Sequence, residues 1–193
     1  MTTQQTLIPL IMIAASLLGG CTTAVVGGAA AGGTIAHDRR TTGTFIEDKE
    51  ILLRAIRMRQ ADDDLRQRSN ISIDAYNMQV LLTGQAEDAD LVQRLADKIT
   101  TIPRVRKVFN EVQIGAEGTW GEAASDTYIT SKVKLAILDA GIEGFDPLRV
   151  KVITSLGTVY LMGLLTNAEA DAVTEKVRFV SGVKRVVRLF EYY

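Results

Sequence analysis

Cysteine and histidine are nearly absent from this sequence of 193 residues, which has one of each, Cys21 and His37. A single cysteine cannot form a disulfide within the chain. A metal site normally draws on several such ligands, and a cysteine nucleophile needs a histidine or a similar base beside it. The sequence therefore predicts no intrachain disulfide, no metal site and no thiol-based catalysis.

Neither sign of charge is in excess. The chain has 22 Lys and Arg residues against 23 Asp and Glu residues, a formal net charge of −1 at pH 7. Binding to nucleic acid through a broad basic surface needs a large positive excess, so no nucleic-acid partner is indicated. The densest acidic run, 62–64, lacks the alternating ligands and the distal Glu of a calcium loop, and we expect a solvated turn there. No carboxylate pair is matched with a nucleophile or an oxyanion donor, so the sequence predicts no enzyme.

Long apolar runs are also scarce. The run Leu7–Leu18 suits the core of a signal peptide and is too short for a transmembrane helix. It leads into Leu-Gly-Gly-Cys, which resembles the lipobox of bacterial lipoproteins. The resemblance implies that residues 1–20 are a signal peptide and that Cys21 carries a covalent lipid, and the sequence indicates no other cofactor. The alternative is a buried apolar helix in which the cysteine has no role.

Small residues follow the cysteine. Residues 21–44 include AVVGGAAAGG and then HDRRTTGT, and the glycines favour a flexible tether. Within it, Arg39 and Arg40 either attract anionic lipid head groups or belong to an ordinary solvated linker. Because Thr22 follows the cysteine, the Asp that retains lipoproteins in the inner membrane of enteric bacteria is absent. We therefore expect a protein anchored by lipid in the outer membrane, at its periplasmic face.

The rest of the chain is a repeat of one unit. The run ISIDAYNMQVLLTG at 71–84 corresponds to VKVITSLGTVYLMG at 150–163. Asp48 corresponds to Asp126, and the later VRKV of the first copy corresponds to VKRV in the second. The separation between the copies stays nearly constant over all three blocks. Chance similarity does not explain this, so the chain contains two copies of one module.

Each copy is predicted to fold as αββαβ. A helical pattern comes first, with Ile129, Val133 and Ile137 on one face in the second copy. The alternation of apolar and polar residues over 71–76 then predicts a strand, followed by a tight turn and a second strand. Residues 166–169 fit a capping box at the start of the next helix, and a last strand follows. The sequence thus predicts an α+β fold, each copy having a three-stranded mixed sheet with both helices on one face.

Two αββαβ units of this length, with a V-x-L-x-G-like pattern after the hairpin and a later GVKRV, resemble BON domains. A lipobox followed by two such units resembles the dual BON-domain outer-membrane lipoproteins of Gram-negative bacteria, over essentially the whole chain. We expect the first BON domain at 45–115, a linker at 116–123 and the second domain at 124–193. The resemblance implies a non-enzymatic role in envelope integrity, with the second domain binding an anionic phospholipid membrane.

The start of the second copy carries residues that suit a lipid surface. Trp120 and Tyr128 each join an apolar ring to a polar group, which favours a membrane interface. Lys132 lies one helical turn after Tyr128, and the lysines favour an anionic bilayer. The predicted phospholipid-binding residues are Trp120, Tyr128, Ile129, Lys132 and Lys134. The alternative is that the aromatic rings pack in the core or the linker while the lysines are only solvated.

A second surface is expected on the sheet face that no helix covers. In the second copy its residues are Tyr160, Met162, Val187 and Leu189. An apolar patch of this kind usually contacts a partner. The other module is the nearest partner, so we expect the two modules to dock through this face. In the alternative function, the same face lets a periplasmic adaptor bind an envelope-assembly or peptidoglycan-remodelling protein.

Overall fold

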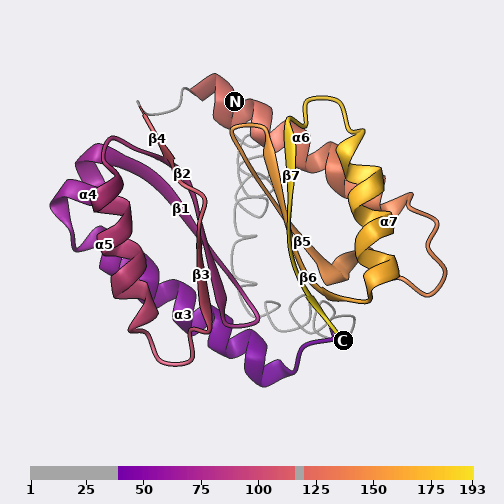
Figure 1. Ribbon diagram of the computed structural model, residues 1–193, viewed down its shortest axis with the longest axis horizontal. Helices are drawn as coiled ribbons and strands as arrows, with labels where there is room; N and C mark the ends of the chain where they lie inside the picture. Colours follow the sequence, from indigo (N-terminus) through magenta and orange to yellow (C-terminus); the bar gives the residue numbers. More distant parts are fainter. Residues whose placement is uncertain (1–38, 116–119) are drawn as a thin grey trace, which may run out of the picture. The chain divides into compact units, whose positions relative to one another are not determined.

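Helices cover one face of a small β-sheet in each half of the chain (Figure 1). The structure, a computed structural model, describes residues 39–115 and 120–193. Both halves belong to one compact unit. We call the described part up to residue 115 the first module and the part from residue 120 the second module.

The first module contains the expected elements and one additional helix. In chain order they are α3 (Thr42–Gln60), α4 (Asp63–Arg68), β1 (Ser69–Tyr76), β2 (Gln79–Ala86), α5 (Ala89–Thr100), β3 (Lys107–Asn110) and β4 (Gln113–Ile114). β1 and β2 form an antiparallel hairpin, and β3 runs parallel to β2 on its other edge. β4 pairs with the next part of β2, so β3 and β4 act as one edge strand in two pieces. The sheet is therefore mixed and three strands wide.

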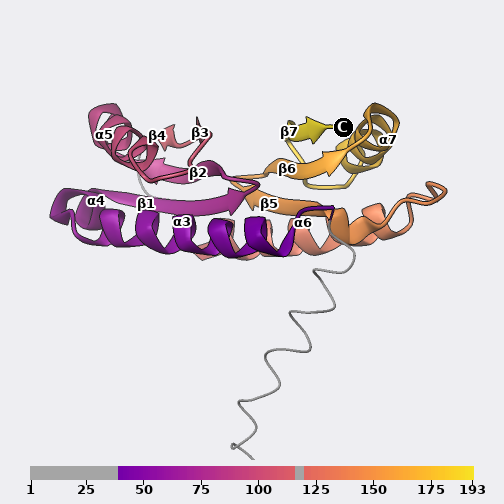
Figure 2. The same cartoon turned by 90° about the horizontal axis from the view of Figure 1, so that it is seen from below.

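The second module repeats this plan with an uninterrupted edge strand. Its elements are α6 (Trp120–Leu138), the 3-10 turn η1 (Pro147–Arg149), β5 (Val150–Ser155), β6 (Thr158–Leu165), α7 (Asn167–Arg178) and β7 (Arg185–Tyr192). β5 and β6 are antiparallel, and β7 runs parallel to β6 along its whole length. Figure 2 shows α3 running along β1 and α6 running along β5. The predicted α+β fold with two αββαβ copies is confirmed.

Capping side chains start two helices at positions that the sequence did not predict. Thr41 accepts a hydrogen bond from the backbone N–H of Thr44, so α3 begins at Thr42, inside the stretch expected to be a tether. Asp62 accepts one from the backbone N–H of Leu65 and starts α4. The acidic run therefore caps a short helix, and the prediction of a turn there was wrong. Carboxylates stabilise this helix start because its unpaired N–H groups carry partial positive charge.

Each module has its own apolar core between its sheet and its helices. The first core includes Ile51 of α3, Leu82 of β2 and Ile99 of α5. The second includes Val133 of α6 and Leu161 of β6. Burying one side chain of this kind contributes about 1.5–3 kcal/mol. The apolar stripe of each helix and the alternation along each strand therefore fix which faces meet.

An aspartate near the start of the first helix holds the hairpin turn in both modules. The carboxylate of Asp48 accepts hydrogen bonds from the backbone N–H groups of Asn77 and Met78, at 2.8 and 2.6 Å. In the second module Asp126 accepts two such bonds at 2.7 and 2.8 Å, from Leu156 and Gly157. All four turn residues have positive φ, between 50° and 78°. This conformation suits a two-residue hairpin and presents adjacent N–H groups to a single carboxylate.

Candidate functional site

Tyr128 and Lys132 lie together on the surface of the second module. Tyr128 is 65% exposed. The ammonium group of Lys132 lies 4.5 Å from the centre of the Tyr128 ring, and it also donates a hydrogen bond to the backbone oxygen of Ser181. The bond to Ser181 connects α6 with the turn after α7. The structure thus brings these two predicted lipid-binding residues into one place.

Two more apolar side chains are exposed on α6 and at the end of α7. Leu135 lies two helical turns after Tyr128 and is 64% exposed, and Phe179 directly follows α7 and is 72% exposed. The guanidinium group of Arg178 lies 4.5 Å from the centre of the Phe179 ring. We call Tyr128, Lys132, Leu135, Arg178 and Phe179 the α6–α7 surface. It combines exposed apolar side chains with cations.

Leu135 and Phe179 were not among the residues predicted from the sequence. The spacing of seven residues from Tyr128 to Leu135 was a usable signal, because residues two turns apart share a helix face. Phe179 gave no such signal. It follows the last residue of α7, and its exposure depends on the turn there, which contacts Lys132 through Ser181.

Lys134 and Ile129 were also predicted to bind lipid, but they do not share the exposed surface of Tyr128 and Lys132. Lys134 is exposed on a different side of α6, where it lines an apolar groove with Leu138 and Leu148. Ile129 is only 4% exposed and belongs to the core of the second module. A Cβ at Gly182 would lie 3.0 Å from Ile129 Cγ1, so the turn after α7 packs directly on this side chain. Ile129 therefore positions α6 against the core, and its prediction as a lipid contact was wrong.

Two residues of the predicted site stay predictions. Cys21 lies outside the described residues, together with the expected signal peptide and most of the tether. Trp120 is the first residue of α6, but its side chain also lies outside the described part.

The residues predicted on the uncovered sheet face lie in one apolar cluster. Tyr160, Met162 and Leu189 are buried, and Val187 is partly buried. The cluster also contains side chains of the first module, namely Tyr76, Leu81 and Phe109. The uncovered faces of the two sheets therefore contact each other. Tyr160 and Met162 are 1% and 0% exposed, so they do not form an open adaptor surface in this structure.

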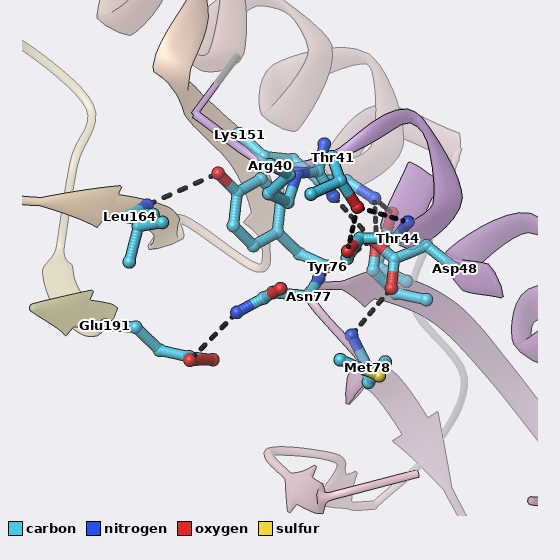
Figure 3. Close-up of polar contacts among 12 residues, drawn as sticks. Arg40, Thr41, Thr44, Asp48, Tyr76, Asn77, Met78, Lys151, Leu164 and Glu191 are labelled. Carbon is cyan, nitrogen blue, oxygen red and sulfur yellow. Dashed lines mark hydrogen bonds and ion pairs between the residues drawn. The ribbon is translucent and has the colours of Figure 1, made fainter. Parts of the chain in front are cut away.

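Hydrogen bonds and ion pairs also join the two modules, and Figure 3 shows those of Tyr76 and Asn77. The hydroxyl oxygen of Tyr76 accepts a hydrogen bond from the backbone N–H of Leu164 at 3.3 Å. The side-chain amide of Asn77 donates one to Glu191 at 2.9 Å. Two ion pairs also join the modules, Lys151–Asp74 at 2.8 Å and Arg185–Glu111 at 3.0 Å. Polar contacts therefore fix the register of the apolar contact.

Arg39 and Arg40 hold the start of the described chain against both modules. The guanidinium group of Arg39 donates two hydrogen bonds to Glu169 of the second module, at 2.8 and 2.9 Å. Arg40 forms an ion pair with Asp48 of the first module and lies 3.7 Å from the centre of the Tyr76 ring. Both arginines therefore pair within the protein. They form neither a lipid head-group site nor a solvated linker, the two alternatives expected from the sequence.

Glu169 is held as a carboxylate by these contacts. Its pKa falls from 4.5 to about 2, and the largest cause is the hydrogen bonding from Arg39. Bonds from the backbone N–H and the hydroxyl of Thr166 lower the pKa further, while burial opposes them. Thr166 and Glu169 also form a capping box at the start of α7, as the sequence predicted.

Among the described residues, no group of three or more His, Cys, Asp or Glu side chains is placed to hold a metal ion. Over the same ranges, no helix combines the length and the apolar character needed to cross a membrane. The α6–α7 surface offers apolar contact area and two cations, Lys132 and Arg178, the second of which also pairs with Glu175. Such a surface suits binding to an anionic, partly apolar partner.

Comparison with known proteins relates the whole repeat to one domain family. The BON domain model matches residues 48–116 and 125–192. The chain is 31% identical over 159 residues to Outer membrane lipoprotein DolP of Haemophilus influenzae, covering 82% of this chain and 81% of the relative. It is 33% identical over 156 residues to the 21 kDa hemolysin of Actinobacillus pleuropneumoniae, covering 80% and 79%. A solved structure of CdsD, a structural protein of the type III secretion system of Chlamydia trachomatis, matches 77% of this chain and 92% of that chain at 14% identity, with a TM-score of 0.30.

Proposed function

The chain belongs to the BON-domain family as a dual BON-domain lipoprotein, and we propose from this premise that it binds anionic phospholipid through its second module at the outer membrane. The relative from Haemophilus influenzae is named as an outer membrane lipoprotein. The Leu-Gly-Gly-Cys sequence ending at Cys21 supports the same anchoring here. The protein then acts at the periplasmic face as a binding protein that supports envelope integrity, and not as an enzyme.

The observation that carries this proposal is the composition of the α6–α7 surface. Tyr128, Leu135 and Phe179 are each more than 60% exposed, and exposed apolar residues that gather on one surface mark a candidate interaction site. Lys132 and Arg178 lie against the two rings. Aromatic rings flanked by cations suit the boundary between head groups and acyl chains.

The expected free energy of membrane binding indicates that the protein needs a lipid anchor in addition to this surface. Partial insertion of an apolar side chain contributes about 1 kcal/mol, roughly half of full burial. A basic residue near an anionic bilayer contributes about 1 kcal/mol as well. The sum gives weak binding for the free module. A lipid on Cys21 raises the effective concentration of the module at the bilayer, so a surface of weak intrinsic affinity is enough to keep the module bound.

Vesicle flotation tests the lipid surface directly. A fragment that starts at residue 37 lacks Cys21 and the apolar N-terminal run, so any binding comes from the modules. We expect it to float with vesicles of phosphatidylglycerol and phosphatidylethanolamine, and only weakly with phosphatidylcholine. Tyr128→Ala combined with Phe179→Ala should reduce binding even in 1 M salt, where charges are screened beyond about 3 Å.

A charge variant supplies the second arm. Lys132→Glu should reduce binding most at low salt, because it reverses a charge at the surface. Lys49→Glu is the matched control, since it makes the same charge change at an exposed position of α3. If the ring variant and Lys132→Glu both float like the wild type while remaining folded, the α6–α7 surface is not the lipid site.

Anchoring needs its own test. In cells, Cys21→Ala should move the full chain out of the outer-membrane fraction, because no thiol is left to carry the lipid. A Cys21→Ala protein that fractionates with the outer membrane as the wild type does would contradict the anchoring proposal without bearing on the lipid surface.

A further inference from the structure

An apolar groove of about 370 Å³ lies at the end of α6 in the second module. Its walls come from α6, from η1 and from the first half of β5. The apolar residues that line it are all aliphatic, namely Ile137, Leu138, Pro147, Leu148, Val150 and Val152. The groove shares no residue with the α6–α7 surface, so the proposed membrane binding does not explain it.

Two exposed leucines stand on opposite walls of this groove. Leu138 of α6 is 61% exposed and Leu148 of η1 is 60% exposed. Ile137 and Val150, which also line the groove, are buried in the core of the second module. A single exposed leucine needs no explanation, but two that share one apolar recess form a patch of the kind that binds a ligand.

The segment between the first helix and the first strand differs between the two modules. In the first module it forms α4, whose Leu65 is buried in the core. In the second module it ends in the short turn η1, whose Leu148 is exposed. Pro147 restricts the backbone of this turn, and the carboxylate of Asp146 accepts a hydrogen bond from the Leu148 N–H at 2.9 Å. Leu148 is therefore held in place as a wall of the groove.

The charged residues that line the groove are positive. They are Lys134 and Lys151, and none of the described lining residues is Asp or Glu. Lys151 pairs with Asp74 at 2.8 Å and donates a hydrogen bond to the backbone oxygen of Ala75 at 3.2 Å. Lys134 is exposed and forms no ion pair or hydrogen bond with the residues at 39–115 and 120–193. One ammonium group beside the groove is therefore left for an anion.

The size and the lining of the groove favour a single alkyl chain. An apolar cavity of about 150 Å³ is enough to hold benzene, so a groove of about 370 Å³ has room for one chain of roughly ten to fifteen carbons. The two chains of a phospholipid exceed this space. A bound peptide is disfavoured, because no lining side chain can accept a hydrogen bond from a peptide N–H.

We propose that this groove binds a fatty acid, with the alkyl chain between Leu138 and Leu148 and the carboxylate beside Lys134. Each methylene group that leaves water for the groove strengthens binding by up to about fourfold. The contact between the carboxylate and the ammonium group selects an acid over an amphiphile with a neutral or cationic head. The ligand is a monomer taken from solution, so this site does not depend on a membrane surface.

A titration followed by NMR tests this proposal on the fragment starting at residue 37. This fragment contains both apolar cores and needs no detergent, whose chains would compete for the groove. The probes are monomeric octanoate and decanoate, and the reporters are the backbone amides of Leu148, Val150 and Val152. We expect saturable shifts at these amides, and roughly tenfold tighter binding of decanoate because its chain is longer by two methylene groups. Decyltrimethylammonium, which has a cationic head, should bind at least about fivefold more weakly than decanoate.

Two pairs of variants locate the binding. Lys134→Gln removes the unpaired charge and should weaken decanoate binding by about fivefold, whereas Lys49→Gln makes the same change at an exposed position of α3 and should bind like the wild type. Leu148→Ser should weaken binding by about fivefold because the chain loses an apolar wall. Leu53→Ser, at an exposed position of α3 outside the groove, should have no effect. Circular dichroism checks that each variant is folded.

Three results would overturn the proposal. They are shifts that do not saturate at the reporter amides, equal affinity for decanoate and decyltrimethylammonium, and unchanged binding in folded Lys134→Gln. Decanoate shifts that centre on Tyr128 and Phe179 would also overturn it, because they would place the chain on the α6–α7 surface. None of these measurements uses vesicles, so the groove and the lipid surface stand or fall separately.

Discussion

Replacing Glu169 by Gln tests whether the ion pair between Arg39 and Glu169 stabilises the folded protein. A carboxyl whose pKa falls from 4.5 to about 2 on folding contributes on the order of 3 kcal/mol of stability at neutral pH. Because the folded pKa is lowered, this contribution is complete above pH 4.5 and is lost as the pH falls toward 2. Glu169→Gln keeps a side-chain oxygen for the capping box but removes the charge that Arg39 binds.

Denaturant unfolding of the fragment starting at residue 37, measured from pH 7 to pH 2.5, gives the required comparison. We expect Glu169→Gln to be less stable than the wild type by about 2–3 kcal/mol at pH 7, with the gap closing as the pH falls. Glu175→Gln on the same helix is the control. Glu175 pairs with Arg178, but both side chains are more than half exposed, so the loss should stay below about 0.5 kcal/mol. A gap for Glu169→Gln that does not change with pH would refute the ionic explanation.

Three further predictions concern the fold, and unfolding free energies measured at neutral pH check all of them. Gly84→Ala should prevent folding or cost more than about 3 kcal/mol, because Gly84 has φ +108° and a Cβ there would overlap the backbone oxygen of Asn70. Asp48→Asn should cost about 2–3 kcal/mol and more than Asp126→Asn, because Asp48 holds Arg40 in addition to its hairpin turn; equal losses would contradict the role of the arginine. Met162→Ala should cost about 3 kcal/mol, since Met162 is fully buried in the cluster between the modules, and a loss below 1 kcal/mol would mean that this contact does not persist in solution.

The module architecture could be predicted because it depends on local periodicity. The alternation within 71–76 and 150–155 and the helical stripe of Ile129 and Val133 each indicate an element and its buried face. Repetition of the pattern then identified two copies. The same alternation placed Tyr160 and Met162 on the uncovered sheet face, which contacts the first module.

Contacts between distant residues could not be predicted in this way. Arg39 lies 130 positions from Glu169, and no spacing within the sequence connects them. The misplacement of Ile129 has a different cause. Tyr128 and Ile129 are neighbours in the chain, but a helix turns about 100° per residue, so one is exposed and the other faces the core.

The depth to which Phe179 enters a bilayer tests the central claim most directly. The fragment starting at residue 37 contains no cysteine, so Phe179→Cys and Leu53→Cys each offer one thiol for an environment-sensitive fluorophore. Leu53 is 54% exposed on α3 of the first module and serves as the control. With phosphatidylglycerol-containing vesicles, we predict a blue-shifted, brighter emission at position 179 and no change at position 53. Unchanged emission at 179, or equal shifts at both positions, would contradict lipid binding through the second module.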